Sequence, residues 1–403
     1  MWLTAAGLSL LLPADARHGL WLPLHLALAG AASVAISGAM QTFAAALTAA
    51  PNPPPVLAMS QLVLVNAGAA SVTVGVTRAQ TWAVAAGGAS FGIAMILLPV
   101  IIMWFWRKGL NRRFRIVFLI YAGALTSIMT GATLGTLIGT GAIDNGTVIL
   151  SLRDAHMVVN VLGWVSLTIV GTFITFLPTV LRVRIPAWKP APPAVALMVG
   201  VALLATGLAF GSSLMAATGS VVFLAGTLGF GALALQVFRT PRRHFIAVSA
   251  KHLLFSVVWF ESGAAVMAFH FIRGVVRDAA PSLVDIQEMF FITFVCGWIL
   301  QVLLGAWLYL LPAQHAGDPA HRKLLLAGVE HLATLEVVAI NTGLALMALQ
   351  AAGAPHAVAV LGAALALAGG ALALAKAWVY PSLAKMKVTS KRAASLWGPV
   401  GSA

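Results

Sequence analysis

Histidine side chains within apolar segments are the residues best suited to chemistry in this chain. His25 and His156 each lie shortly before a glycine in a long apolar run, and His270 lies near the end of another. A neutral imidazole can bind heme iron, copper or zinc without bringing a charge into an apolar environment. Axial heme ligation needs two histidines that face each other from different helices. We therefore expect His25 and His156 to bind a b-type heme, with copper as the alternative metal and His270 as a reserve ligand.

A second group of ionisable residues falls in two later apolar segments. It comprises Lys251, His252 and Glu261 in one segment and Glu330, His331 and Glu336 in the next. Charged groups within a bilayer are costly, so those that are present usually mark function. Glu261 and Glu336 are expected near mid-membrane, where they form either a proton relay or a structural polar network with the two histidines. His252 and His331 are alternatively a second pair of metal ligands.

The remaining candidate residues have simpler interpretations. Five histidines in or beside loops are expected to be solvated: His18, His244, His315, His321 and His356. The single cysteine, Cys296, provides no disulfide framework. The sequence has no Cys-x-x-Cys-His motif, no Walker motif and no dinucleotide fingerprint. Covalent c-type heme, ATP hydrolysis and a flavin site within this chain are therefore not expected, and no catalytic residue is assigned.

The composition indicates that these residues lie in a membrane. Of 403 residues, 61% are hydrophobic and only 8% are charged, whereas soluble domains carry about 25% charged residues. Apolar runs of about 20 residues recur along the whole length, which is typical of a polytopic helical membrane protein. The net charge of +14 lies mainly in short loops between these runs. Membrane topology explains this charge better than nucleic-acid binding does.

We expect eleven transmembrane helices, at 19–49, 55–77, 81–106, 116–141, 149–181, 193–215, 218–238, 245–272, 286–312, 324–350 and 357–381. Met1–Pro13 is too short to span and lacks the basic start of a signal peptide. Basic residues gather at 107–115, 182–189, 239–243, 322–323 and 385–392, after every second span. The positive-inside rule then places the N-terminus outside and the C-terminus inside a bacterial-type inner (cytoplasmic) membrane.

One sequence phrase links the histidines to the order of the helices. Gly-Trp, six residues, Gly, six residues and Pro occurs from Gly163 to Pro178 and again from Gly297 to Pro312, with a fainter copy at Gly30 and Gly38. The copies start 133 and then 134 residues apart, on the first, fifth and ninth expected helices. We therefore expect one transmembrane domain over 1–403, built from three four-helix repeats at approximately 14–148, 149–282 and 283–403.

The segment from Asp154 to Trp164, continuing through Leu177–Arg182, resembles the heme-copper oxidase superfamily, especially its NnrS-like members. It is also similar to the membrane domain of actinobacterial copper-oxidase-like proteins, as are Leu22–Gly38, Arg112–Phe114 and Gln301–Pro312. In these families the phrase reads approximately His-x-His-Leu-Asn-Leu-Leu-Gly-Trp. The resemblance implies a pseudo-threefold arrangement of four-helix arcs, as in heme-copper oxidase subunit I. It also implies twelve helices, with Met1–Pro13 as a remnant of the first.

The chain departs from this family pattern at several ligand positions. Val158 replaces the second histidine of the phrase, and Phe290 and Ile292 occupy both positions in the third copy. A proton-pumping terminal oxidase is therefore not expected. The resemblance implies that the chain binds heme and takes part in electron transfer or nitric-oxide-related redox chemistry. It also implies a partner protein that donates electrons. Two alternatives stay open: a non-catalytic subunit or assembly partner of a respiratory or copper-enzyme complex, and a proton-coupled transporter that uses Glu261 and Glu336.

Overall fold

A computed structural model describes residues 1–111, 114–184, 189–240, 247–315 and 319–396, without the side chains at 313, 315, 319–322 and 377–396. Within this part every regular element is helical, and eleven helices are long and apolar enough to cross a membrane. The chain is therefore an all-helical, multi-pass membrane protein, in which each helix satisfies its own backbone. His244 and parts of three predicted basic segments (112–113, 185–188 and 241–243) lie outside the described residues.

The α-helices are α1 (Trp2–Ser9), α2 (Trp21–His25), α3 (Ser33–Thr48), α4 (Pro55–Thr77), α5 (Thr81–Lys108), α6 (Arg115–Gly139), α7 (Gly146–Val158), α8 (Leu167–Leu181), α9 (Ala191–Ala209), α10 (Ser213–Arg239), α11 (Val248–Val276), α12 (Gln287–Phe290), α13 (Gln301–His315), α14 (Pro319–Glu330), α15 (Ala333–Ala351) and α16 (His356–Leu396). Three π-helical segments, η1 (Leu26–Ala32), η2 (Val159–Ser166) and η4 (Phe291–Leu300), and one 3₁₀ turn, η3 (Val284–Ile286), complete the order.

The eleven predicted spans agree with these helices to within about four residues except at four boundaries. The seventh span was predicted to start at residue 218, but α10 starts at Ser213, and the eleventh was predicted to end at residue 381, but α16 continues to Leu396. The sixth span was predicted to reach residue 215, but α9 ends at Ala209 because Gly211 takes a left-handed turn with φ of +70°. The tenth was predicted to start at residue 324, but α14 ends at Glu330 and α15 starts at Ala333. Leu332 between them has a φ of +54°, which a continuous right-handed helix cannot contain.

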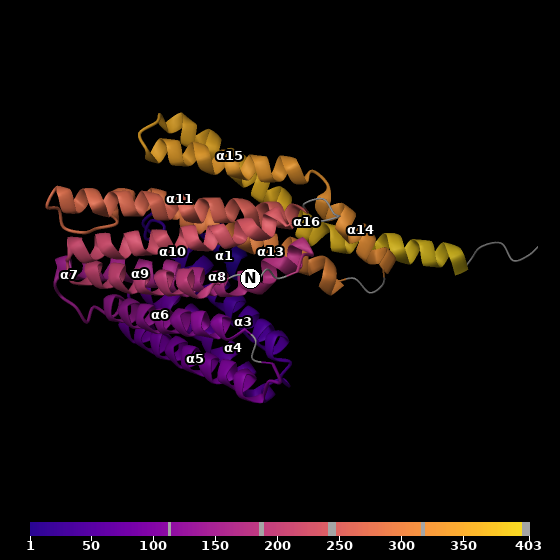
Figure 1. Ribbon diagram of the computed structural model, residues 1–403, viewed down its shortest axis with the longest axis horizontal. Coiled ribbons are helices and arrows are strands. Elements are labelled where there is room, and N and C mark those ends of the chain that lie inside the picture. The colour runs from indigo at the N-terminus through magenta and orange to yellow at the C-terminus, as the bar shows by residue number, and fades with distance from the viewer. Residues whose placement is uncertain (112–113, 185–188, 241–246, 316–318, 397–403) are drawn as a thin grey trace, which may run out of the picture. The chain divides into compact units, whose positions relative to one another are not determined.

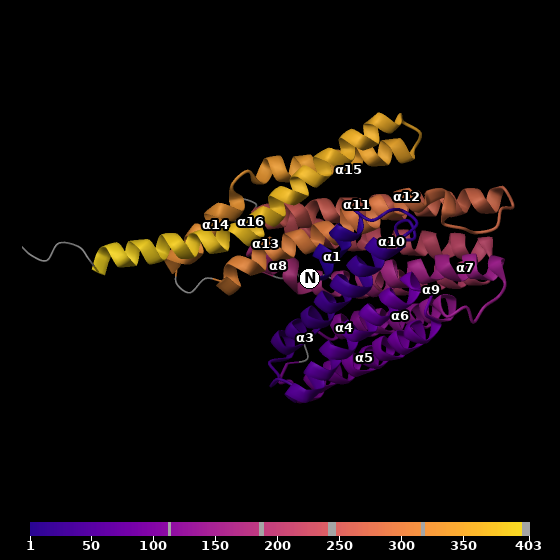
Figure 2. The same cartoon turned by 180° about the vertical axis from the view of Figure 1, so that it is seen from behind.

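The chain forms two compact units. The first comprises Met1–Ile174, Trp188–Phe230 and Met267–Val284. In it α4, α5 and α6 run side by side, as Figure 1 and, from behind, Figure 2 show. α6 also packs against α7 and η2. This packing brings the helix that carries His156 against the glycine-rich face of α6.

Two antiparallel helix pairs in the first unit, α4–α5 and α9–α10, approach closely through glycines. A Cβ at Gly68 would lie 2.6 Å from the backbone nitrogen of Phe91, and a Cβ at Gly200 would lie 2.5 Å from that of Phe223. Side chains do not fit at these distances, so glycine permits the helix backbones to touch. Further contacts of this kind join Gly75 with Val84, Gly87 with Val72, Gly207 with Ala216 and Gly219 with Leu204.

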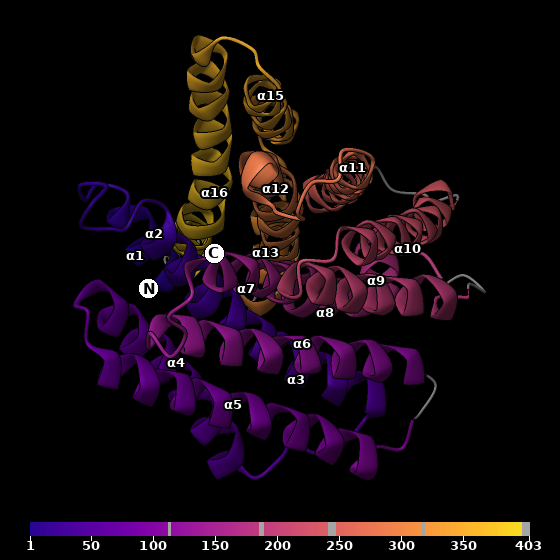
Figure 3. The same cartoon turned by 90° about the vertical axis from the view of Figure 1, so that its left-hand side faces the viewer.

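The second unit comprises Thr175–Ala187, Gly231–Val266 and Asp285–Ala403. Figure 3 shows its antiparallel pair α15–α16, joined by a turn at Gly353. This pair uses the same glycine packing, since a Cβ at Gly343 would lie 2.5 Å from the backbone nitrogen of Ala366. Gly362 meets Met347 and Gly369 meets Ile340 in the same way.

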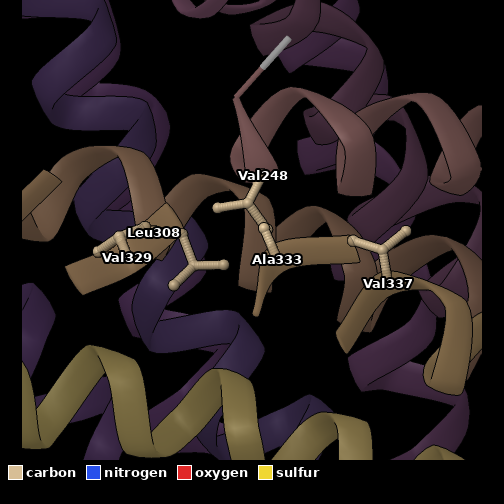
Figure 4. Close-up of a cluster of buried hydrophobic side chains, with 5 residues drawn as sticks. All are labelled: Val248, Leu308, Val329, Ala333 and Val337. Atoms are coloured by element: carbon tan, nitrogen blue, oxygen red, sulfur yellow. The ribbon is translucent and has the colours of Figure 1, made fainter. Parts of the chain in front are cut away.

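Four helices of the second unit meet in a buried apolar cluster. Figure 4 shows its members, which are Val248 of α11, Leu308 of α13, Val329 of α14, and Ala333 and Val337 of α15. Beside it, both carboxylate oxygens of Glu330 accept the Val248 N–H, at 3.0 and 3.1 Å. Burial raises the pKa of Glu330, and this hydrogen bond opposes the shift. The cluster and the hydrogen bond hold α14 and α15 against α11 on both sides of the break at Leu332.

The π-helical segments fall at the repeated sequence phrase. Each contains the first glycine of one copy: Gly30 in η1, Gly163 in η2 and Gly297 in η4. π-helix is rare in proteins and is frequent at functional sites. A local helix distortion therefore coincides with all three copies of the phrase.

The glycine contacts predict that Gly200→Ala destabilises the protein, because the new Cβ would push α9 away from the Phe223 backbone of α10. We expect a loss of about 1–3 kcal/mol, typical of overpacking. The matched control is Gly92→Ala in α5, where a Cβ would have no heavy atom within 4 Å. That change should be neutral or stabilising by up to about 1 kcal/mol. Thermal unfolding in detergent measures both, and equal effects would contradict the proposed role of Gly200.

Candidate functional site

The structure brings together His25 and His156, which are far apart in the sequence. Their imidazole rings lie with centroids 6.3 Å apart and planes 13° from parallel. Both side chains are half-buried. His25 is the last residue of α2, directly before η1, and His156 lies three residues before η2. The pair therefore sits at the start of two π-helical segments in the first unit.

Hydrogen bonds fix the tautomer of both rings. Nδ1 of His25 lies 2.8 Å from the carbonyl oxygen of Trp21, and Nδ1 of His156 lies 2.8 Å from that of Gly131. The Asn160 amide nitrogen lies 3.2 Å from Nδ1 of His156, but its shorter bond is to the His156 carbonyl oxygen at 2.7 Å. A carbonyl oxygen only accepts, so each Nδ1 carries the hydrogen and donates it. In the neutral ring this leaves the lone pair on Nε2. The same arrangement orients histidines in metal sites, where the second nitrogen binds the metal.

Neighbouring residues hold each ring in place. Trp21 stacks on His25 with ring centroids 4.1 Å apart. Gly135 makes room for His156, because a Cβ there would lie 2.7 Å from Cε1 of the ring. Asn160, one turn after His156, donates from Nδ2 to the His156 carbonyl oxygen at 2.7 Å. Gly131 and Gly135 are four residues apart on α6, so both face the same side of that helix.

His270, which was expected as a reserve ligand of the metal, forms a hydrogen bond to the protein backbone instead. Its Nε2–H donates to the carbonyl oxygen of Ser282 at 2.8 Å. Asp154 holds the same segment, because its Oδ2 accepts the Ser282 hydroxyl at 3.0 Å and the Leu283 N–H at 2.8 Å. Asp154 is buried, and it also pairs with Arg153 at 3.1 Å. Both residues thus anchor the segment after α11, a role that the sequence did not reveal for Asp154.

The third copy of the phrase contains apolar packing where ligands would lie. Phe290 and Ile292 are buried, with Phe290 packed against Phe291 and Phe294 at centroid distances of 6.1 and 5.0 Å. In the second copy, Val158 is completely buried. These side chains offer no donor atom to a metal. Among the described residues, no group of three or more His, Cys, Asp or Glu side chains could hold a metal ion.

A second polar site lies in the second unit and is completely buried. Nε2 of His252 on α11 lies 2.8 Å from Oε1 of Glu336 on α15, so the structure joins these two predicted residues. The ammonium group of Lys376 on α16 donates to the other carboxylate oxygen. All three side chains are at most 1% exposed. The sequence interpretation missed Lys376, although a lysine in the middle of the last apolar run is the signal that could have identified it.

Three further polar residues extend this cluster. Gln301 on α13 places Oε1 3.3 Å from Nδ1 of His252 and exchanges two hydrogen bonds with Asn341 on α15. The indole N–H of Trp259 donates to Oδ1 of Asn341 at 2.8 Å. With both ring nitrogens engaged, His252 has no lone pair free for a metal. Its expected role as a metal ligand is therefore not favoured.

The other candidate residues lie outside these two clusters. His331 is exposed at the break before α15. Glu261 is half-buried over the backbone of Gly231, without a hydrogen-bond or ion-pair partner in the part of the chain that the structure describes. His18 and His356 are exposed, as predicted. The side chains of His315 and His321 lie outside the described residues.

The Asp154 contacts predict that Asp154→Ala destabilises the first unit, because the buried Leu283 N–H would lose its acceptor. The expected cost is about 1–3 kcal/mol, with faster proteolysis of the segment that follows α11. Asp144→Ala is the matched control, since Asp144 is exposed. Limited proteolysis and thermal unfolding of both variants measure the difference. A D154A protein that behaves like D144A would contradict the anchoring role.

No protein-family model matches the sequence, and no curated protein matches it at a significant level. The chain's own residues therefore carry the functional inference.

Proposed function

We propose that this chain is a heme-binding integral membrane protein in which His25 and His156 would hold a b-type heme. The observation that carries the proposal is the pair of near-parallel imidazoles, each with its Nδ1–H held by a backbone carbonyl. Such second-sphere hydrogen bonds fix the ring orientation and raise the basicity of the ligating nitrogen. A heme so bound supplies one-electron redox chemistry.

The ring separation supports the proposal. A nitrogen–metal bond of about 2.0–2.1 Å on each side, with each ring centroid about 1.1 Å behind its nitrogen, separates the centroids by about 6.2–6.4 Å. The centroids of His25 and His156 are 6.3 Å apart. This separation equals that of two imidazoles on opposite sides of one metal whose Nε2 atoms point at each other, which is the geometry that the proposal requires.

The number of donors favours heme over a metal ion held by protein ligands alone. Structural and catalytic zinc sites use three or four protein ligands. The described residues contain no group of three or more candidate ligands. Two histidines suffice for heme, because the porphyrin provides the other four nitrogens. Copper stays the alternative metal, and elemental analysis of the purified protein distinguishes it from iron.

The proposal includes three copies of one four-helix repeat. Its first support is the position of the π-helical segments, each at one copy of the phrase. Its second support is the helix pairs α4–α5, α9–α10 and α15–α16, whose glycine contacts correspond. The matching contacts are Gly68 with Phe91, Gly200 with Phe223 and Gly343 with Ala366, and likewise Gly87 with Val72, Gly219 with Leu204 and Gly362 with Met347.

Contacts between the last helix of one repeat and the first helix of the next also correspond. In the first unit Gly163 meets Ser127, Gly171 meets Tyr121, and Gly131 meets Asn160. In the second unit Gly297 meets Trp259, Gly305 meets Leu253, and Gly263 meets Thr293. The number of residues that separates equivalent positions of the second and third repeats is larger for the glycine contacts of α15–α16 than for these contacts. The longer connection that contains α14 accounts for the difference.

Electron transfer and nitric-oxide-related redox chemistry need only one heme, whereas oxygen reduction would need a second metal beside it. The single pair of histidine ligands therefore favours the first two functions. The positions equivalent to a second ligand set contain Val158, Phe290 and Ile292, which cannot ligate. The resemblance to NnrS-like proteins points the same way. The positive-inside rule places the His25–His156 pair near the outer face of the inner membrane, within reach of an electron-donor protein on that side.

The optical spectrum of the purified protein tests this proposal. The wild-type protein, expressed with an adequate heme supply, should show a Soret band and stoichiometric iron. His25→Ala and His156→Ala should each lower the heme content at least tenfold, since each removes one of only two ligands. Gly135→Val should act in the same direction, because its side chain would displace the His156 ring.

Two histidine variants serve as controls for the loss of heme. His18→Ala changes an exposed residue, and His270→Ala changes a residue that bonds to Ser282. Both should retain the Soret band. A wild-type protein without heme, or unchanged heme content in both H25A and H156A, would rule out the assignment.

A further inference from the structure

The short helix α1 packs against the segment that carries His25. Its residue Ala6 forms a buried apolar cluster with Leu22 and Leu26, which lie on either side of His25 in the sequence. Trp21 packs against this cluster, and it also stacks on the His25 ring and accepts the Nδ1–H of that ring. The residue that orients His25 therefore rests on a cluster that α1 helps to form.

Trp2, the first residue of α1, joins η1 to α4. Its indole ring covers Gly30 of η1, where a Cβ would lie 2.5 Å from Cε3 of the ring. Its indole N–H donates to Oδ1 of Asn66 on α4 at 2.7 Å. Asn66 is held in turn, because its Nδ2 donates to the carbonyl oxygen of Leu62 at 2.8 Å.

The π-helical geometry of η1 connects Gly30 with His25. A π-helix bonds each residue to the one five positions away, and Gly30 lies five residues after His25. A ring that fixes Gly30 against α4 therefore also restrains the backbone from which the His25 side chain extends. Trp2 thus acts on His25 by two routes, one through Gly30 and one through the cluster beneath Trp21.

The second unit contains the same contacts at the third copy of the phrase. A Cβ at Gly297 would collide with the ring of Trp259. The Trp259 N–H donates to Oδ1 of Asn341 at 2.8 Å, and Nδ2 of Asn341 donates to the carbonyl oxygen of Val337 at 2.8 Å. Asn66 and Asn341 each lie two residues before the glycine through which their helix touches the next one. The recurrence indicates that this contact serves the helix that carries the phrase.

The two copies differ in the residue that the contact restrains. Five residues before Gly297 stands Ile292, which is buried and has no donor atom. The equivalent residue of the first copy is His25. In the third copy the tryptophan belongs to α11, a helix of 29 residues, whereas α1 has only 8 residues. The contact is thus kept in the first copy by a helix too short to span a membrane.

We propose that Trp2 is a positioning residue for His25, which holds η1 against α4 and so fixes the direction of the His25 Nε2 lone pair. This inference rests on the proposed function, because a fixed lone pair matters only where His25 binds a metal. Second-sphere partners that orient a ligand commonly contribute to metal affinity without touching the metal. Trp2 has this kind of role.

Heme retention tests this role in the loaded protein. Trp2→Ala should accelerate the transfer of heme to apomyoglobin at least about tenfold, the lower end of what second-sphere partners contribute to metal affinity. Trp2→Phe keeps an aromatic ring over Gly30 and should restore most of the retention. Asn66→Leu removes only the acceptor of the indole N–H, so it should accelerate the transfer less than Trp2→Ala does. If W2A does not fold, N66L decides the question.

The matched control is Trp259→Ala, because it removes the same contact from the copy that lacks a histidine. It should destabilise the protein but leave the rate of heme transfer and the ferric paramagnetic resonance spectrum at their wild-type values. Equal acceleration of heme transfer by W2A and W259A would reveal a general structural effect and overturn the proposal. A wild-type rate of transfer in both W2A and N66L would overturn it as well.

The protein without heme provides an independent test. With ¹⁵N-labelled histidine in nanodiscs, His25 of the wild-type protein should give the signal of a neutral ring protonated at Nδ1, identified by its loss in His25→Gln. In Trp2→Ala a ring protonated at Nε2 should also appear, because the Trp21 carbonyl no longer holds the ring. An unchanged His25 signal in folded W2A contradicts the positioning role. If this change occurs in a protein that binds no heme, the heme assignment fails and the positioning of His25 stands.

Discussion

Buried polar groups must find partners inside the protein, because a bilayer offers no water to satisfy them. This constraint selects helices for the backbone, since a helix pairs its own N–H and C=O groups. It also explains the glycine contacts, which let helix backbones pack without polar side chains between them. Most buried polar side chains of the described residues bond to nearby carbonyl oxygens or to one another. The few arrangements that go beyond local pairing are therefore the informative ones.

The two polar sites meet this constraint in opposite ways. In the second unit, the bonds of His252 to Glu336 and Gln301 use both ring nitrogens. In the first unit, His25 and His156 each use one nitrogen on a backbone carbonyl and keep the other as a lone pair. A histidine with both ring nitrogens hydrogen-bonded links helices, and a pair with one lone pair each suits ligation. The partner of the second nitrogen thus decides which role a histidine takes.

Apolar runs predicted all eleven spans and the limits of seven of them closely, because hydrophobic length is a strong signal in a membrane protein. The turn at Gly211 and the break at Leu332 were missed, since leucine in a left-handed conformation leaves no sequence mark. The phrase at Gly30, Gly163 and Gly297 pointed to equivalent helices, two of which carry His25 and His156. Gln301, Asn341 and Trp259 could not be predicted, because ordinary amides and indoles become a network only through helix packing. The sequence gives no sign that Asp154 is an anchor, and only its contacts with Ser282 and Leu283 reveal this role.

The central claim is that one metal lies between His25 and His156 with both imidazoles bound. Electron paramagnetic resonance of the oxidised, purified protein addresses this most directly, because ligand number and ring orientation set the ferric spectrum. Two axial imidazoles with planes 13° apart predict a low-spin rhombic signal, lost in His25→Ala and in His156→Ala. A high-spin signal in the wild-type protein, or heme iron whose signal survives both substitutions, would contradict the account.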